Sequence, residues 1–204
     1  MFLHTRRLVP LLLLALPLPG QEKATTASGR VVLLFPDGTW KEDKPAAVPG
    51  GREGATRPRS ATEKFPVLKG KASIYYDPQK WKPKGPEEGG RSGFNHVDGD
   101  AQSMVITERI QMPLASLEKV ALDNAKAAAP DATVAFREMR RVNGQDLLAL
   151  QIKGTINGIA FIYYGYYYSG ERGIIQAIAF TSQNLFQEYK ADFEAFLNGL
   201  VIEP

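Results

Sequence analysis

Two Asn-Gly pairs, Asn143-Gly144 and Asn157-Gly158, divide one stretch of this chain into long runs of β-forming residues. Asn-Gly between such runs is the strongest short-range signal for a tight hairpin turn. An SGERG loop separates the last of the runs from the one before it. The four predicted strands are Thr133–Val142, Gln145–Ile156, Ile159–Ser169 and Gly173–Thr181. The two Asn-Gly pairs and the SGERG loop predict consecutive antiparallel hairpins in one sheet.

The third run carries five tyrosines within six residues and is apolar on both faces. Successive strand residues point to opposite sides. One predicted face holds Ile159, Phe161, Tyr163 and Tyr167, and the other holds Ala160, Ile162, Tyr164, Tyr166 and Tyr168. A strand that is apolar on both faces is typical of the middle of a sheet that is covered on both sides. A stacking platform for a planar ligand is the alternative, and a bulge at Gly165 would reverse the faces after it.

Two further segments repeat apolar residues at helical spacing, one that ends at Pro130 and one that runs from Leu185 to Leu200. Ser182 is the expected N-cap of the second, and Gly199 is its stop signal. Burying its seven large apolar groups gains about 1.5–3 kcal/mol each, whereas fixing the backbone costs about 1–2 kcal/mol per residue. This helix therefore forms only when it packs on the sheet. The predicted fold class is α+β, a largely antiparallel sheet flanked by helices (an α/β/α sandwich), preceded by a short β-hairpin and a flexible linker.

The first residues have the three parts of an export signal. Arg6 and Arg7 precede a short apolar core, which is followed by a Pro-rich stretch that ends at Gly20. We expect residues 1–20 to be removed, with cleavage after Ala24 or Ala27 as alternatives, and we expect no stable membrane anchor afterwards. The sequence has no cysteine, which excludes a lipoprotein anchor and disulfides. The protein is therefore predicted to be exported, either periplasmic or secreted.

The remaining chain divides by composition. Residues 29–43 contain Asp37-Gly38 followed by Thr39 and Trp40, a DGTW segment that predicts a β-hairpin. Residues 44–69 are rich in Pro, Gly and charge, which predicts a disordered linker. The main domain is expected over 70–204. It begins with strand 71–76, and a long loop over 82–102 precedes strand 103–110.

Several chemistries are disfavoured by the residues that are missing. Outside the signal His96 is the single histidine, and it lies in a Gly-rich loop without a nucleophile elbow. Zinc hydrolase sites need more histidines or a thiolate. Asp98 and Asp100 are weak candidates for a hard cation, but their spacing does not fit a calcium loop. The basic run 137–141 divides between two strand faces, so no nucleic-acid partner is predicted. No cofactor is predicted either.

The order of these elements resembles the PsbP-like family, named for an extrinsic photosystem II subunit and sharing its fold with a Ran-binding import factor. The likeness rests on Tyr76-Asp77-Pro78 with Trp81, on Asn143-Gly144, on FIYYGYYYS and on FQEYKADFEAFLNGL, and it spans residues 71–200. It implies an α/β/α sandwich and a mostly non-catalytic accessory or binding role. The DGTW hairpin and the linker depart from the usual pattern of the family, and indicate an exported bacterial variant.

The expected function is that of an exported, non-enzymatic protein that binds an unidentified protein or envelope component. Two alternatives stay open. In the first, surface aromatics bind a small ligand or carbohydrate, and the residues that would do so are Trp81, Tyr164, Tyr166 and Tyr168. In the second, the chain is a hydrolase that uses carboxylates or His96.

Overall fold

The computed structural model describes residues 22–25, 31–36, 38–42, 54–86 and 88–203, which fall into two units, 1–45 and 46–204. The predicted signal peptide, 1–20, lies outside the described residues. In the first unit, β1 (Glu22–Thr25), β2 (Val31–Leu34) and β3 (Trp40–Glu42) form an antiparallel sheet in that order. The β2–β3 pair confirms the hairpin predicted around the DGTW segment.

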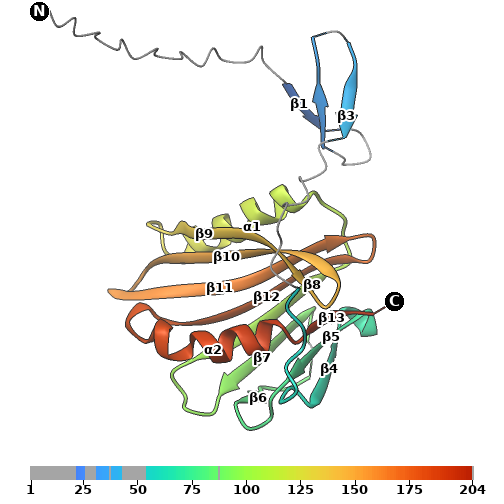
Figure 1. Cartoon of the computed structure of the whole chain (residues 1–204). Helices are drawn as coiled ribbons and strands as arrows, with labels where there is room; N and C mark the ends of the chain where they lie inside the picture. Colours follow the sequence, from blue (N-terminus) through green and yellow to red (C-terminus); the bar gives the residue numbers. More distant parts are fainter. Residues whose placement is uncertain (1–21, 26–30, 37, 43–53, 87, 204) are drawn as a thin grey trace, which may run out of the picture. The chain divides into compact units, whose positions relative to one another are not determined.

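The described residues of the second unit form two antiparallel sheets and two helices (Figure 1). The larger sheet has the order β6-β7-β8-β12-β11-β10-β9, and the smaller has the order β13-β5-β4. The strands are β4 (Glu63–Val67), β5 (Ala72–Tyr76), β6 (Trp81–Pro83), β7 (Arg91–His96), β8 (Gln102–Glu108), β9 (Thr133–Val142), β10 (Gln145–Ile156), β11 (Ile159–Gly170), β12 (Gly173–Ser182) and β13 (Leu200–Ile202). The helices are α1 (Leu114–Ala128) and α2 (Phe186–Leu197), and the short 3₁₀ turns are η1 (Leu68–Gly70) and η2 (Gln183–Leu185).

The two predicted Asn-Gly turns are present and connect β9 to β10 and β10 to β11. Asn143 and Gly144 have φ angles of 48° and 82°, and Asn157 and Gly158 have 50° and 79°. Two positive φ values in a two-residue loop define the turn whose twist matches that of the flanking strands, which explains the Asn-Gly choice. The four strands predicted from these turns and the SGERG loop are therefore confirmed as β9 to β12.

The larger sheet is covered by α1 on one face and by α2 on the other (Figure 1). The α1 side buries Leu117 of the helix against Leu148, Leu150 and Tyr167 of the sheet. The opposite face packs against five α2 residues, which are Phe186, Tyr189, Phe193, Phe196 and Leu197. This arrangement confirms the predicted α/β/α sandwich. No helix in the described ranges combines the length and apolarity that crossing a membrane requires.

The tyrosine strand, β11, keeps its register through Gly165. That residue pairs with Leu150 of β10 and with Ile178 of β12, and the pairs before and after it follow without a shift. There is consequently no bulge, and the two predicted faces are confirmed. The register shift in this part of the sheet lies between Gln151 and Ile152, where β9 and β10 pair.

Part of the predicted linker is ordered. Ala55 forms a parallel bridge with Val142 of β9, and residues 63–67 form β4. Pro66 lies in that strand because β4 is at the edge of its sheet, where a residue without an N–H group is tolerated. The prediction of a linker was therefore wrong for 54–69, and residues 44–53 lie outside the described residues.

The prediction of a long loop over 82–102 was also wrong, because strand β7 lies within that range. Its Gly and Pro residues are concentrated in the flanking turns, such as Gly89 and Gly90, which both have positive φ. Along β7 buried and more exposed side chains alternate, with Ser92, Phe94 and His96 buried.

The prediction that Ser182 caps the last helix was also wrong. The turn η2 follows Ser182 first, and α2 begins without a side-chain cap.

Candidate functional site

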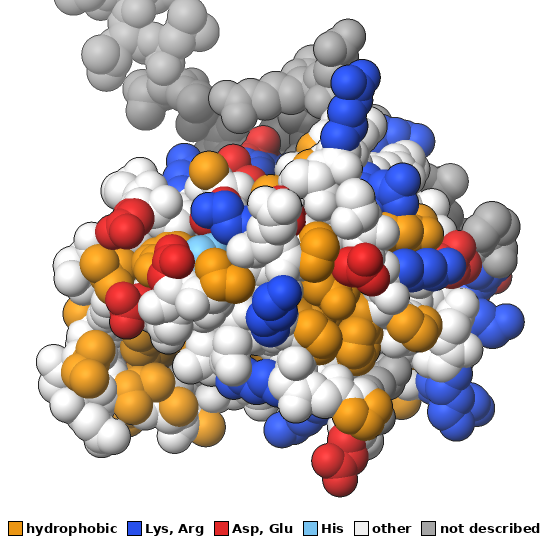
Figure 2. Space-filling model, turned by 90° about the horizontal axis from the view of Figure 1, so that it is seen from below, with side chains coloured by type: hydrophobic (Ala, Val, Ile, Leu, Met, Phe, Trp, Pro, Cys, Tyr) orange, Lys and Arg blue, Asp and Glu red, His pale blue; other side chains and the backbone are white. Residues whose placement is uncertain are grey.

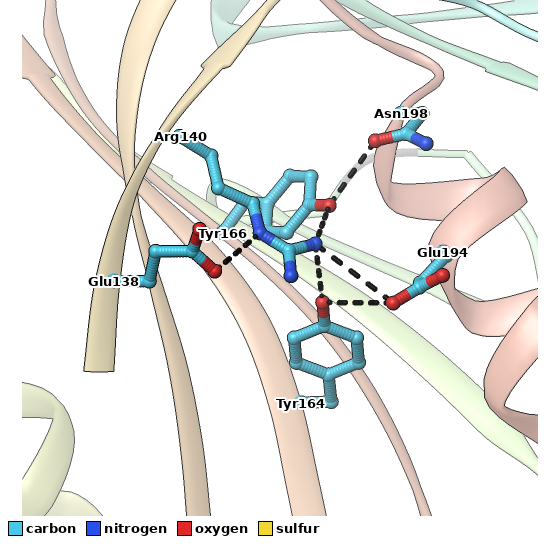
Figure 3. Close-up of polar contacts among 6 residues, drawn as sticks. All are labelled: Glu138, Arg140, Tyr164, Tyr166, Glu194 and Asn198. Atoms are coloured by element: carbon cyan, nitrogen blue, oxygen red, sulfur yellow. Dashed lines mark hydrogen bonds and ion pairs between the residues drawn. The ribbon is translucent and has the colours of Figure 1, made fainter. Parts of the chain in front are cut away.

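The most extensive polar cluster around the tyrosine strand is centred on Arg140 of β9 (Figure 3). Its Nη1 group donates to the hydroxyls of Tyr164 and Tyr166, at 2.7 and 3.0 Å, and its Nε group donates to Glu138 at 3.1 Å. The strand alternation that places both tyrosines on the α2 face of β11 also places Arg140 on that face of β9. The Arg140 side chain is 21% exposed, so it lies at the rim of the core.

The two tyrosine hydroxyls also donate hydrogen bonds, one to helix α2 and one to the residue after it. Tyr164 donates to Oε1 of Glu194 at 3.4 Å, and Tyr166 donates to Oδ1 of Asn198 at 3.1 Å. The same Glu194 oxygen lies 3.8 Å from Nη1 of Arg140. The cluster thus ties β9, β11 and the C-terminal end of α2 together through side chains alone (Figure 3).

Burial raises the pKa of both Tyr164 and Tyr166, and the Arg140 charge offsets only part of that effect. Burial also raises the pKa of Tyr167 on the other face of the strand. All three hydroxyls are therefore neutral near pH 7, and those of Tyr164 and Tyr166 act as hydrogen-bond donors. A neutral tyrosine held between an arginine and an acceptor stabilises the contact of sheet and helix, and is not poised as a base or nucleophile.

These pKa shifts predict a loss of stability in alkali. An unfolded tyrosine has a pKa near 10, whereas the folded pKa values of Tyr164, Tyr166 and Tyr167 are higher. The folded state binds these protons more tightly, so their contribution is complete below about pH 10 and is lost as the pH rises further. Urea unfolding between pH 8 and pH 11 should show this decline, and a Tyr164→Phe/Tyr166→Phe chain should decline less steeply. An equally steep decline in that variant would contradict the assignment.

The structure does not bring the four predicted ligand-binding residues together. Tyr164 and Tyr166 are neighbours in the cluster above and are 1% and 0% exposed, while Tyr168 is half-buried beside Gly170. Trp81 lies on β6, which three strands separate from β11 in the sheet, and is 1% exposed. Its ring packs on that of Phe196, with 4.8 Å between the centroids. Stacking on a ligand by these rings stays a prediction, and in this arrangement three of them have almost no exposed surface.

His96 is a fully buried side chain whose two ring nitrogens are both occupied. Its Nε2 lies 3.1 Å from Oδ2 of Asp192, and its Nδ1 accepts the backbone N–H of Asp98 at 3.3 Å. Lys80 reaches the same Asp192 oxygen at 3.2 Å. A serine hydrolase that used His96 as its base would need a hydroxyl nucleophile on one of these ring nitrogens, and a carboxylate and a backbone amide are there instead.

The two weak metal candidates have other contacts. Oδ2 of Asp98 lies 3.4 Å from Nδ1 of His96, and the backbone carbonyl of Asp100 accepts a hydrogen bond from Thr181 at 2.7 Å. Within the described ranges, no three or more His, Cys, Asp or Glu side chains gather closely enough to hold a metal ion.

Sequence reasoning did not identify the Arg140 cluster. It did place Arg140 on the opposite strand face from Arg137 and Arg141, and the structure agrees, because Arg137 pairs with Glu118 of α1 on the other side of the sheet. The acceptors Glu194 and Asn198 carried no comparable signal, since they meet the tyrosines only after α2 packs on the sheet.

No protein-family model matches this chain, and no curated protein does. Among solved structures, the chain is similar to the cyanobacterial PsbP (CyanoP) of Synechocystis sp. PCC 6803, with a TM-score of 0.51 and 15% identity over 78% of this chain and 99% of that one. It is also similar to LpqN of Mycobacterium tuberculosis, a protein involved in cell envelope biogenesis, with a TM-score of 0.46 and 12% identity over 65% of this chain and 83% of that one. The likeness to CyanoP confirms the PsbP-like fold.

Proposed function

We propose that this chain is an exported, non-catalytic accessory protein that acts by binding a protein or another component of the cell envelope. One observation carries the proposal: the polar groups best suited to chemistry are buried and bonded internally. Both ring nitrogens of His96 are occupied, and the hydroxyls of Tyr164 and Tyr166 are held by Arg140, Glu194 and Asn198. Such groups build a stable scaffold, and the function of a scaffold of this kind lies at its surface.

Two further lines support the proposal. The PsbP-like fold is shared with a cyanobacterial PsbP, and the family that the residue pattern resembles consists mostly of accessory and binding proteins. The basic and apolar segments of residues 1–20 favour export, in agreement with a role in the envelope.

The proposal is tested with the full chain carrying a C-terminal tag in a bacterial host. After fractionation and reversible cross-linking, we expect the processed chain outside the cytoplasm, joined in constant proportion to one envelope component. That component, once purified, should bind the purified chain saturably. Retention of the unprocessed chain in the cytoplasm would contradict export. Turnover of any substrate in a broad hydrolase panel, lost in a folded His96→Gln variant, would contradict the non-catalytic role.

A further inference from the structure

A small hollow of about 60 Å³ lies beside Trp81, on the surface between the N-terminal part of the second unit and α2. Its lining includes Ser60, Asp77, Lys80, Trp81, Asp192 and Phe196. The volume corresponds to roughly two water molecules, far below the roughly 300–1,000 Å³ of a typical small-molecule site. The hollow therefore fits the end of one side chain and excludes a free metabolite of ordinary size.

The carboxylates of the hollow are held in place before any ligand arrives. Asp192 accepts from both His96 and Lys80 on one oxygen, at 3.1 and 3.2 Å. Asp77 accepts the backbone N–H of Gln79 at 2.8 Å, which fixes its carboxylate on the turn before β6. Trp81 and Phe196 also line the hollow, and each of them is only 1% exposed. A pair of fixed carboxylates is a favourable environment for a cationic group.

Helix α2 also has an acidic environment around Tyr189, one turn before Asp192 of the lining. Four carboxylates act on Tyr189 of α2: those of Asp98, Asp100, Glu188 and Asp192. Burial is the first cause that raises the pKa of this tyrosine, and these charges add to it. On the face drawn in Figure 2, acidic and basic side chains both lie near the histidine surface. In the lining itself, two carboxylates face one ammonium group, that of Lys80.

From this geometry we infer that the hollow receives a lysine or arginine side chain of the protein partner. The inference rests on the proposed function and adds the chemistry of the contact. The partner's ammonium or guanidinium group lies between Asp77 and Asp192, while Lys80 turns outward. The acidic groups around Tyr189 attract the basic segment that carries this residue.

The experiment follows the indole N–H signal of Trp81 by NMR in the full chain, with the signal of Trp40 as the internal reference. The probes are three capped tripeptides, Gly-Arg-Gly, Gly-Lys-Gly and Gly-citrulline-Gly. We expect saturable shifts at Trp81 with arginine or lysine, no shifts with citrulline, and weaker binding at higher salt. Equal shifts with citrulline and arginine would overturn the inference, because citrulline keeps the shape of arginine without its charge.

Three single substitutions test the inference further. Asp77→Asn keeps the acceptor for Gln79 but removes a charge, and should weaken arginine binding by about two- to fivefold, the range of a partly exposed ion pair. Lys80→Met removes the competing cation and should strengthen binding. Asp123→Asn removes an equal charge from α1, on the other face of the sheet, and should change nothing. Unchanged binding in Asp77→Asn, or weaker binding in Lys80→Met, would overturn the inference.

The proposed function and the inferred contact at the hollow can be contradicted independently of each other. If an envelope component binds the chain and Asp77→Asn leaves that affinity unchanged, the hollow is not the contact, although the binding role stands. If the charged tripeptides bind at Trp81 but no envelope component does, the hollow is a cation site and the proposed function is wrong.

Discussion

Replacing Gly199 by alanine should lower the free energy of unfolding by about 3 kcal/mol, the upper end of the range for overpacked sites. A β-carbon at this position would lie 1.8 Å from the carbonyl oxygen of Tyr75 and 2.9 Å from that of Phe196. Both are backbone atoms, so no side-chain rotation relieves the overlap. The Tyr75 amide donates to the Gly199 carbonyl at 2.8 Å, and β13 starts at the next residue and pairs with β5. Relief therefore requires the junction of α2 and the smaller sheet to open.

Gly93→Ala is the matched control for this substitution. Its β-carbon would also meet a close atom, Cδ of Lys84 at 2.9 Å, but that atom belongs to a flexible side chain that can move away. Chemical denaturation of both variants should show a loss at Gly93 of less than about 1 kcal/mol, as for most surface changes. Equal losses at the two glycines would show that the backbone contact with Tyr75 is not the cause.

The parts of the fold that the sequence predicts are those set by local signals. The Asn143-Gly144 and Asn157-Gly158 turns need only two residues with positive φ, and Asn-Gly supplies both. The covered sheet follows in the same way from the two apolar faces of β11, because alternation is a property of the strand itself. The apolar stripe of α2 requires a sheet to pack on, and the same strands provide that sheet.

The parts that sequence reasoning misses depend on partners far away in the chain. β4 pairs with β5 and is recognisable only in that context, because Pro66 and the charges around it are typical of a linker. β13 has three residues and exists because β5 lies beside it. The Arg140 cluster joins β9 to Glu194 and Asn198, and no local pattern connects those positions. Short strands and polar side-chain networks are both products of tertiary packing, and local propensity carries little information about them.

Trp81→Ala should lower the free energy of unfolding by about 3–5 kcal/mol, the usual loss for a large aromatic residue in a core. The ring is 1% exposed and has aromatic neighbours from two elements: His96 of β7 at 5.0 Å, and Phe193 and Phe196 of α2 at 6.2 and 4.8 Å between centroids. Removing it leaves a cavity where the edge of the larger sheet meets α2. Urea unfolding of the two chains measures the loss directly.

The size of that loss separates the two roles considered for this tryptophan. A ring that serves mainly to stack on a ligand is exposed, and its removal changes stability little, as we expect for Val97→Ala in the neighbouring loop, where the valine is 48% exposed. Trp81→Phe keeps an aromatic surface and should recover more than half of the stability that alanine loses. If Trp81→Ala instead costs no more than Val97→Ala, the ring is not part of the core, and its assignment to ligand stacking becomes the better account. A large loss that phenylalanine largely restores assigns Trp81 to the core that shapes the hollow, because the carboxylates of Asp77 and Asp192 are positioned on elements that this ring holds together.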